Sequence, residues 1–267
     1  MGYICAVTGK GGVGKTMVSA LLTRQLIKNG REPVLAIDAD PNSCLDAALG
    51  VKAGNTVGRA REEVRDAAAD AAKSGISKQD LLQYKIAESL VESDCFDLIA
   101  MGRPEGAGCY CYANNVLKNV IAEISSEYPY VVLDNEAGLE NLSRRIVSTV
   151  DMLVLVSDAS NAGLKTLARL HELALEMGTQ YKKLILVINR LRSGAPLDNI
   201  GVQPGNSSAL PSNIKEIMEL TGADGVIGLP DDADVAEFNE QGKSLLGLPD
   251  DNRVVARIDG LARIMGQ

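Results

Sequence analysis

The sequence has few aromatic residues, a single histidine and no tryptophan among its 267 residues. A histidine-rich zinc site or a Ser-His-Asp catalytic triad would have to be built around His171 alone, so neither is expected. His171 falls in a segment where leucines recur at helical spacing, and we predict that it lies on the surface of that helix.

Cysteine is also scarce. Five cysteines in a chain of this length do not make a disulfide framework, and an odd number cannot all pair. Cys5, Cys44 and Cys95 lie within or beside apolar segments, where ordinary buried cysteines occur. Cys109 and Cys111 are separated by one residue, which sets this pair apart from the other three.

Long apolar runs and an excess of positive charge are both absent. Runs such as Met152–Val156 and Leu184–Ile188 are far shorter than the roughly 20 residues that span a bilayer. A glycine-rich loop begins close to the start of the sequence, so we expect no secretory leader. The 27 Lys and Arg face 35 Asp and Glu, and the net charge of −8 argues against a general basic surface that binds DNA. We expect a cytoplasmic protein with neither a membrane nor a nucleic acid as partner.

With 46% apolar residues the chain can bury a sizeable core. Short runs rich in Val, Ile and Leu alternate with longer segments of helical period, which predicts an α/β fold with a mostly parallel central sheet and helices on both faces. The predicted strands are Tyr3–Thr8, Pro33–Asp38, Phe96–Met101, Tyr130–Asp134, Met152–Val156, Leu184–Asn189 and Gly225–Gly228. The predicted helices are Thr16–Lys28, Asn114–Ser126, Asn161–Met177, Ser212–Thr221 and Asp251–Met265.

Two regions depart from this alternation. Residues 57–93 contain two helical patterns in succession, and we interpret them as a helical insertion after the second strand. Residues 193–211 are rich in Gly, Pro, Asn and Ser, which is typical of a long surface loop. There is no internal repeat or low-complexity tail, so residues 1–267 are predicted to form one domain.

A glycine-rich motif joins the first predicted strand to the first predicted helix, and it reads Gly9-Lys10-Gly11-Gly12-Val13-Gly14-Lys15-Thr16. In this context the glycine spacing and the Lys-Thr pair are those of a phosphate-binding loop. The glycines allow backbone N–H groups to converge on phosphate oxygens at the N-terminus of a helix. Lys15 is placed to contact the β- and γ-phosphates, and the Thr16 hydroxyl to ligate Mg²⁺.

Lys10 is a second lysine, at the start of this loop. It resembles the additional lysine of the deviant Walker A motif in the class that contains MinD, ParA and the nitrogenase iron protein. The resemblance implies that Lys10 reaches the nucleotide of a partner subunit, where its charge would stabilise the transferred phosphoryl group. Hydrolysis of ATP would then depend on formation of a homodimer.

Three aspartates end or follow predicted strands. Asp38 and Asp40 follow the second strand, in the sequence Asp-Ala-Asp-Pro-Asn, and Asp134 ends the strand Tyr130–Asp134. Ligands of such folds bind at the carboxyl ends of the parallel strands, so the three carboxylates should lie together. The resemblance assigns Asp40 to orienting the attacking water, places Asp38 near Mg²⁺, and makes Asp134 the Walker B residue that holds Mg²⁺ directly or through water.

The same class suggests how the base is bound. Asn189 resembles its adenine-contacting asparagine, and the segment around Pro230 resembles the one that closes over the other side of adenine. No Asn-Lys-x-Asp guanine motif is present, so ATP and ADP are expected ligands. The expected catalytic residues are Lys10, Lys15 and Asp40, and the expected nucleotide-binding residues are Gly11, Gly12, Val13, Gly14, Lys15, Thr16, Met17, Asn189, Leu229, Pro230 and Asp231.

Cys109 and Cys111 lie in a glycine-rich loop between a predicted strand and a predicted helix. That location can expose both sulfur atoms, and a nearby helix N-terminus favours their thiolate forms. A tetrahedral thiolate site needs four ligands. Because no histidine is nearby, a second copy of the chain across a two-fold axis is the simplest source of the other two.

Several stretches together resemble the nickel-insertion ATPases of carbon monoxide dehydrogenase maturation, the CooC family. They are Lys10–Thr16, Asp38–Asn42, Gly102–Asn114, Asp134–Glu140 and Leu142–Arg145. The resemblance implies an ATPase that dimerises on nucleotide, holds one Ni²⁺ or Zn²⁺ between two Cys109/Cys111 pairs, and delivers nickel to carbon monoxide dehydrogenase. Thiolates accept both metals, and ATPases that act on acetyl-CoA synthase share these motifs, so the metal and the client stay open.

Two other functions stay open as well. A MinD- or ParA-like spatial regulator would share the nucleotide site but would need a membrane or DNA surface. The last predicted helix, Asp251–Met265, lacks the Phe or Trp and the lysine run of a membrane-surface helix, and is expected to pack on the sheet. An iron–sulfur reductase of the nitrogenase-iron-protein kind would need two cysteines far apart in the sequence, and no cysteine follows Cys111.

Overall fold

The computed structural model describes residues 2–73, 77–102, 121–137, 149–195, 197, 203–204 and 210–265, with all their side chains except those of 68–73, 137 and 203–204. The strands are β1 (Tyr3–Gly9), β2 (Val34–Asp38), β3 (Val91–Glu92), β4 (Phe96–Ala100), β5 (Tyr130–Ala137), β6 (Thr149–Asp158), β7 (Gln180–Leu191), β8 (Gln203–Pro204) and β9 (Gly225–Pro230). The helices are α1 (Lys15–Lys28), α2 (Leu45–Leu49), α3 (Val57–Lys73), α4 (Lys78–Ala87), α7 (Asn161–Glu176), α8 (Ser212–Thr221), α9 (Ala233–Glu240), the 3₁₀ turn η1 (Leu245–Gly247) and α10 (Arg253–Ile264).

The strands of the described residues form one sheet in the order β3-β4-β2-β5-β1-β6-β7-β9-β8. Every pair of neighbours from β4 to β9 is parallel, and the short strands β3 and β8 add antiparallel edges. Parallel strands require crossover connections, which the helices provide. The predicted mostly parallel α/β sheet is confirmed.

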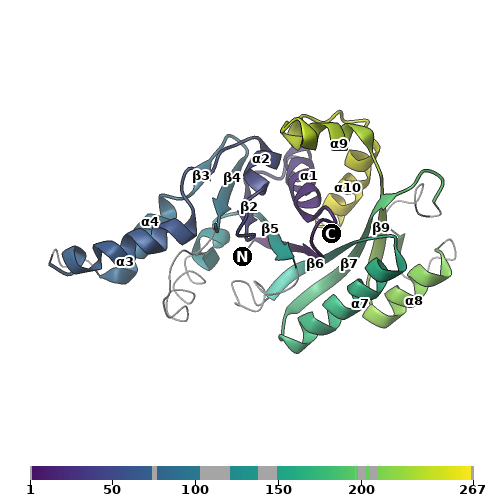
Figure 1. Cartoon of the computed structure of the whole chain (residues 1–267), viewed down its shortest axis with the longest axis horizontal. Coiled ribbons are helices and arrows are strands. Elements are labelled where there is room, and N and C mark those ends of the chain that lie inside the picture. The colour runs from purple at the N-terminus through teal and green to yellow at the C-terminus, as the bar shows by residue number, and fades with distance from the viewer. Residues whose placement is uncertain are drawn as a thin grey trace.

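Helices cover both faces of this sheet (Figure 1). α1 and α10 pack on one face, called here the α1 face, and α3, α4, α7 and α8 pack on the other, called the α7 face. Successive residues of β1 alternate between the two cores, since Cys5 and Val7 are buried on the α1 face and Ala6 on the α7 face. Both cores consist mainly of Val, Ile and Leu, which explains why the strands show little apolar–polar alternation.

Each predicted strand is present, and α1, α7, α8 and α10 match predicted helices. Of the predicted helix Asn114–Ser126, residues 121–126 lie in the described part and are helical. α2, α9, η1, β3 and β8 were not predicted. α10 packs on the sheet as expected, and its buried residues are Val254, Val255, Ile258, Leu261 and Ala262.

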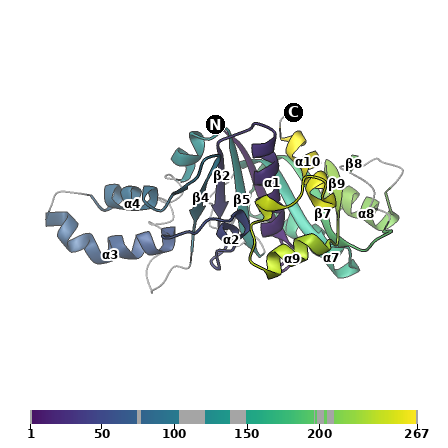
Figure 2. The same cartoon turned by 90° about the horizontal axis from the view of Figure 1, so that it is seen from above.

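The predicted helical insertion at residues 57–93 forms α3 and α4, followed by the edge strand β3. The two helices lie side by side and project beyond β4 as a hairpin (Figure 2). Its base is anchored in the core of the α7 face by Val57, Val64, Leu82 and Ile86. The insertion therefore extends one edge of the sheet and leaves the carboxyl ends of the central strands uncovered by it (Figures 1 and 2).

His171 is not a surface residue, and that prediction is wrong. Its side chain on α7 is 7% exposed, and Nε2 shares a hydrogen bond of 2.7 Å with the Tyr181 hydroxyl on β7. The periodicity placed His171 correctly on a helix, but the polar partner that permits its burial comes from a different element.

The two ends of the described chain lie at the same edge of the sheet, where the central strands begin (Figure 2). Tyr3 at the start of β1 and Met265 after α10 line one hollow, together with Tyr130, Asp151 and Lys183 from the first residues of β5, β6 and β7. The phosphate loop lies at the opposite edge, since it follows the carboxyl end of β1. None of the helices in the described part of the chain is long and apolar enough to cross a membrane.

Candidate nucleotide-binding site

The phosphate loop leads from β1 directly into α1. β1 ends at Gly9 and α1 begins at Lys15, with Gly14 as its N-cap in a left-handed conformation (φ 96°). Gly12 is also left-handed (φ 76°), and glycine adopts this conformation without steric cost. No side chain caps α1 at Gly14, so the first N–H groups of the helix stay available to phosphate oxygens.

The two lysines of the loop differ in their surroundings. Lys15 is 7% exposed, and its ammonium group donates to the carbonyl oxygen of Lys10 at 3.3 Å. Lys10 itself is exposed. Lys15 therefore lies inside the loop, as contact with a bound phosphate would require. Lys10 lies on the surface, as contact with a partner's nucleotide would require.

Two of the three predicted carboxylates meet beneath the loop. Asp38 on β2 and Asp134 on β5 are register partners in the parallel sheet, so their side chains lie on the same face, the α1 face. They are 0% and 1% exposed. The hydroxyl groups of Thr16 and Ser19, both on α1, donate to Asp134, the latter to Oδ1 at 3.2 Å.

Burial raises the pKa of Asp134 to about 7, and the negative charge of Asp38 acts in the same direction. Hydrogen bonds from Thr16 and Ser19 and the charge of Lys15 oppose the rise. Two buried carboxylates and a threonine hydroxyl are oxygen ligands of the kind that Mg²⁺ prefers. A divalent cation would also offset the repulsion between the carboxylates, so this donor set fits Mg²⁺.

Asp38 also organises the chain that follows β2. Its Oδ2 accepts from the N–H of Leu45, the first residue of α2, at 2.9 Å, and its Oδ1 accepts from the N–H of Asp40 at 3.0 Å. Burial raises the pKa of Asp38 to about 6 in spite of these two hydrogen bonds. Asp40 is half-buried, and its Oδ1 accepts from the backbone and side-chain nitrogens of Asn42 at 2.8 and 3.0 Å. Asp40 is thereby fixed just beyond the buried pair.

The residues expected at the base lie in three different environments. Asn189 is 4% exposed, and its Nδ2 donates to the carbonyl oxygen of Val13 in the phosphate loop at 2.8 Å. The Leu229 side chain is fully buried in the core of the α1 face, so a base could meet only its backbone. Pro230 is buried at the end of β9, and Asp231 is exposed beyond it.

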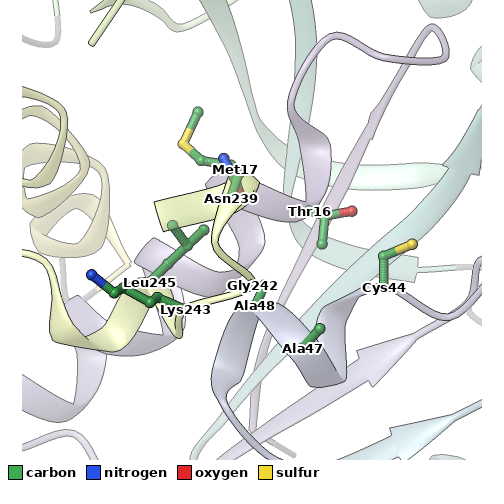
Figure 3. Close-up of a pocket in the computed structure, with 9 residues that line it drawn as sticks. All are labelled: Thr16, Met17, Cys44, Ala47, Ala48, Asn239, Gly242, Lys243 and Leu245. Atoms are coloured by element: carbon green, nitrogen blue, oxygen red, sulfur yellow. The ribbon is translucent and has the colours of Figure 1, made fainter. Parts of the chain in front are cut away.

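A pocket of about 260 Å³ opens beside the first turn of α1 (Figure 3). Thr16 and Met17 border it from α1, Cys44 stands before α2, and Asn239 and Lys243 come from α9 and the residues after it. Met17, expected at the nucleotide, lines this pocket next to Thr16, although most of its side chain is buried in the core of the α1 face. Cys44 is exposed at this pocket and is not the buried cysteine that the sequence suggested.

Two polar residues of the site were not predicted. Ser19 lies one helical turn after Thr16 and donates to the same carboxylate. Asp158 ends β6, and hydrogen bonds from Ser160 lower its pKa, with smaller contributions from the positive charges of Lys10 and Arg190. An aspartate at the carboxyl end of a strand was the available signal, but the predicted strand Met152–Val156 stopped before reaching it.

Cys109 and Cys111 lie outside the described residues. The chain that carries them leaves the sheet at the carboxyl end of β4, next to β2. There the N–H of Met101 donates to the carbonyl oxygen of Asp38 at 2.8 Å, and Gly102 (φ 63°) packs against Thr56. The cysteine-bearing segment therefore starts from a residue bonded to the end of β2.

The family model described as AAA domain (AAA_31) matches residues 1–186. The protein belongs to this family. An uncharacterised ATP-binding protein of Methanocaldococcus jannaschii is 40% identical over 97% of this chain and 96% of its own length. The carbon monoxide dehydrogenase accessory protein CooC of Rhodospirillum rubrum is 32% identical over 72% of this chain and 75% of its own.

Among solved structures, the MinD cell division protein of Aquifex aeolicus superimposes with a TM-score of 0.66 over 100% of this chain and 98% of its own, at 22% identity. At this identity the likeness concerns the fold. The protein accordingly belongs to the AAA_31 family and has the fold seen in the structures of MinD and of a ParA family ATPase.

Proposed function

We propose that this protein is an ATPase that inserts nickel into carbon monoxide dehydrogenase. ATP draws two copies of the chain together through Lys10, and the Cys109/Cys111 pairs of both copies then hold one Ni²⁺ or Zn²⁺ between them. Hydrolysis to ADP and phosphate removes this constraint, and the two copies separate. Nickel is released because two thiolates hold it less well than four.

The observation that carries the proposal is a Cys-x-Cys pair in an ATP-binding chain that is 32% identical to CooC. The described residues support a connection between the two sites. The Asp38 side chain lies beside Asp134 in the candidate Mg²⁺ site, and the Asp38 carbonyl accepts from Met101, directly before the cysteine-bearing segment. A shift of β2 at the nucleotide would therefore reach that segment through one hydrogen bond.

The residues of the site take complementary roles in this proposal. Thr16, Asp38 and Asp134 hold Mg²⁺, which when bound neutralises part of the charge on the phosphate oxygens. Lys15 binds the phosphates from within the loop. Asp40, fixed two residues after β2, orients the attacking water with the carboxylate oxygen that does not accept from Asn42.

The decisive test removes the two thiols and leaves the phosphate loop intact. Wild-type protein incubated with Mg²⁺, ATP and either Ni²⁺ or Zn²⁺, then separated by gel filtration, should retain one metal ion for each pair of chains. Cys109→Ser/Cys111→Ser should retain none, because serine hydroxyls do not replace thiolates as ligands of these metals. The variant should still bind ATP, which calorimetry measures.

The matched control is Cys44→Ser/Cys95→Ser, which also removes two thiols, one exposed and one half-buried. It should keep the metal. If Cys109→Ser/Cys111→Ser bound as much metal per pair of chains as the wild type, the assignment of the metal ligands would be refuted, but the proposed ATPase activity would not. Failure of the wild type to bind ATP at all would refute the nucleotide site as well.

A MinD- or ParA-like spatial regulator is the second candidate, and the likeness of fold to MinD favours it. Such a protein would bind a membrane or DNA when ATP is present. α10 has its apolar side against the sheet, where Val255, Ile258 and Leu261 are 0 to 1% exposed. ATP-dependent co-sedimentation with anionic lipid vesicles or with DNA would favour the regulator. A maturation ATPase for acetyl-CoA synthase would instead show the metal binding described above with a different client.

A further inference from the structure

The side-chain amide of Asn189 bonds to backbone on both of its sides. Nδ2 donates to the Val13 carbonyl at 2.8 Å, and Oδ1 accepts from the N–H of Arg190 at the same distance. The residue is 4% exposed. Both polar atoms of the amide therefore have partners within the protein before any base is considered.

The contact with Val13 bears on how the loop presents its N–H groups. A loop that turns its N–H groups toward a phosphate turns carbonyl groups away from it, and a buried carbonyl without a donor is unfavourable. Asn189 supplies that donor from β7, two strands away from β1 in the sheet. The loop is thus tied to a rigid strand at the centre of its turn.

Gly14 makes this contact sterically possible. A Cβ atom at position 14 would lie 2.4 Å from Nδ2 of Asn189, well inside van der Waals contact. The glycine required by the left-handed φ of 96° is therefore required a second time, by the approach of the amide to Val13. The end of β7 can therefore approach the phosphate loop this closely because residue 14 has no side chain.

We propose that Asn189 is a positioning residue of the phosphate loop, and that it sets the affinity for the polyphosphate part of the ligand. This rests on the proposed function only in that the loop binds nucleotide phosphates. If Asn189 served only to recognise adenine, its substitution would leave the affinity for a ligand without a base unchanged. A base-free polyphosphate separates the two.

The experiment measures the binding of ATP and of inorganic tripolyphosphate, each with Mg²⁺, by calorimetry. Asn189→Ala should weaken tripolyphosphate binding about 10-fold and ATP binding by at least the same factor, because Val13 loses its donor. Asn189→Asp keeps the shape but places a carboxylate oxygen against the Val13 carbonyl, and should weaken both ligands further. It also keeps the test available if Asn189→Ala is unfolded. Unchanged tripolyphosphate affinity in a folded variant would overturn the proposal.

Asn252→Ala is the matched control. Asn252 is likewise a buried asparagine (6% exposed), but its Nδ2 donates to Asp232 and its Oδ1 caps α10, away from the loop. It should lower the melting temperature without changing the tripolyphosphate affinity. If the wild-type protein binds neither ligand, the proposed function fails, an outcome distinct from a wild type that binds both and variants that bind tripolyphosphate equally well.

Discussion

The two faces of the sheet bury polar side chains in different ways. On the α1 face, Ser19 and Arg24 of α1 reach out of their own helix, Ser19 to Asp134 on β5 and Arg24 to backbone carbonyls around η1. On the α7 face, Ser89 and Thr221 donate to carbonyls three or four residues earlier in their own segments. The side-chain contacts of α1 on the α1 face therefore connect separate elements, whereas those of Ser89 and Thr221 stay local. On the α7 face, the contacts between elements come from pairs such as Tyr128–Asp97 and His171–Tyr181.

The two faces differ in how accurately their side chains must be positioned. α1 carries the phosphate loop at its N-terminus, and its first turns contact the buried carboxylate of β5. Side-chain hydrogen bonds fix the position of a helix relative to a strand more sharply than apolar packing, which tolerates changes of shape. We expect substitutions on the α1 face to be sensitive to geometry and those on the α7 face to be sensitive to volume.

The largest expected effect is on catalysis at the loop end of the α1 face. Lys10→Ala should lower ATP hydrolysis by roughly 100- to 1000-fold, because a cation that stabilises transition-state charge is lost. ATP binding and the melting temperature should change little, since Lys10 is exposed. Phosphate release and calorimetry measure the two effects. Lys182→Ala, an exposed lysine at the start of β7, is the control and should hydrolyse ATP normally; equal rates in both variants would contradict the role of Lys10.

The next effect compares stability on the two faces. Arg24 is 4% exposed and donates to the Leu246 and Leu248 carbonyls at 3.1 and 2.7 Å and to Asp250. Arg24→Met should lower the free energy of unfolding by about 3 kcal/mol, because buried carbonyls lose their donors. Arg24→Lys should recover little of it, since an ammonium group cannot reproduce the planar fork. Urea unfolding measures both.

The counterpart on the α7 face is Leu167, which is fully buried on α7. Leu167→Met conserves volume approximately and should cost less than about 1.5 kcal/mol in the same urea experiment. If Leu167→Met were as destabilising as Arg24→Met, or if Arg24→Lys were fully stable, the contrast between a geometry-sensitive and a volume-sensitive face would be broken.

The smallest effect concerns one of the polar pairs between elements on the α7 face, the buried pair His171–Tyr181. Burial lowers the pKa of His171 below its usual value of 6.5, and the charge of Glu172 opposes this only in part. As pH falls through 6.5 the unfolded chain takes up the proton first, so the stability present above 6.5 is partly lost toward the lower pKa of the folded state. This is the chain's one histidine, so its proton resonance gives the pKa without ambiguity. A midpoint at or above 6.5 would contradict the prediction.

Much of the fold followed from the sequence because the sheet is buried on both sides. The apolar runs correctly predicted seven strands of the described sheet, namely β1, β2, β4, β5, β6, β7 and β9. The same criterion ended β6 at Val156, although pairing with β7 continues to Asp158. Backbone pairing continues beyond the last apolar residue of β6. The additional residues, Ser157 and Asp158, lie at the carboxyl end of the strand, where the candidate site is.

The elements that were missed depend on tertiary contacts or on weak local signals. α2 is one short helix whose first N–H is bonded by Asp38, seven residues earlier and on a strand. The helix propensity of residues 45–49 gives no information about the hydrogen bond to Asp38. α9 begins after Asp232, whose side chain accepts from Val235, and this capping pattern was readable in the sequence.

The candidate site likewise contains residues that the sequence could place and residues whose positions depend on tertiary contacts. Residues of the loop and the carboxylates Asp38 and Asp134 could be placed together because parallel strands present their carboxyl ends at one edge. The contact of Asn189 with Val13 could not, since it joins residues 176 positions apart and depends on the absence of a side chain at Gly14. The burial of the Leu229 side chain likewise depends on which face of β9 meets α1 and α10.

Tyr3 and Met265 border the same hollow, at the edge of the sheet that faces away from the phosphate loop. Labels or surface tethers attached beside Tyr3 or Met265 would therefore lie away from the phosphate loop. A short linker between Tyr3 and Met265 would also close this part of the chain into a ring. Circular permutants opened elsewhere, for instance at Glu88–Leu90 after α4, would then test whether the phosphate loop forms when the order of the elements along the chain is changed.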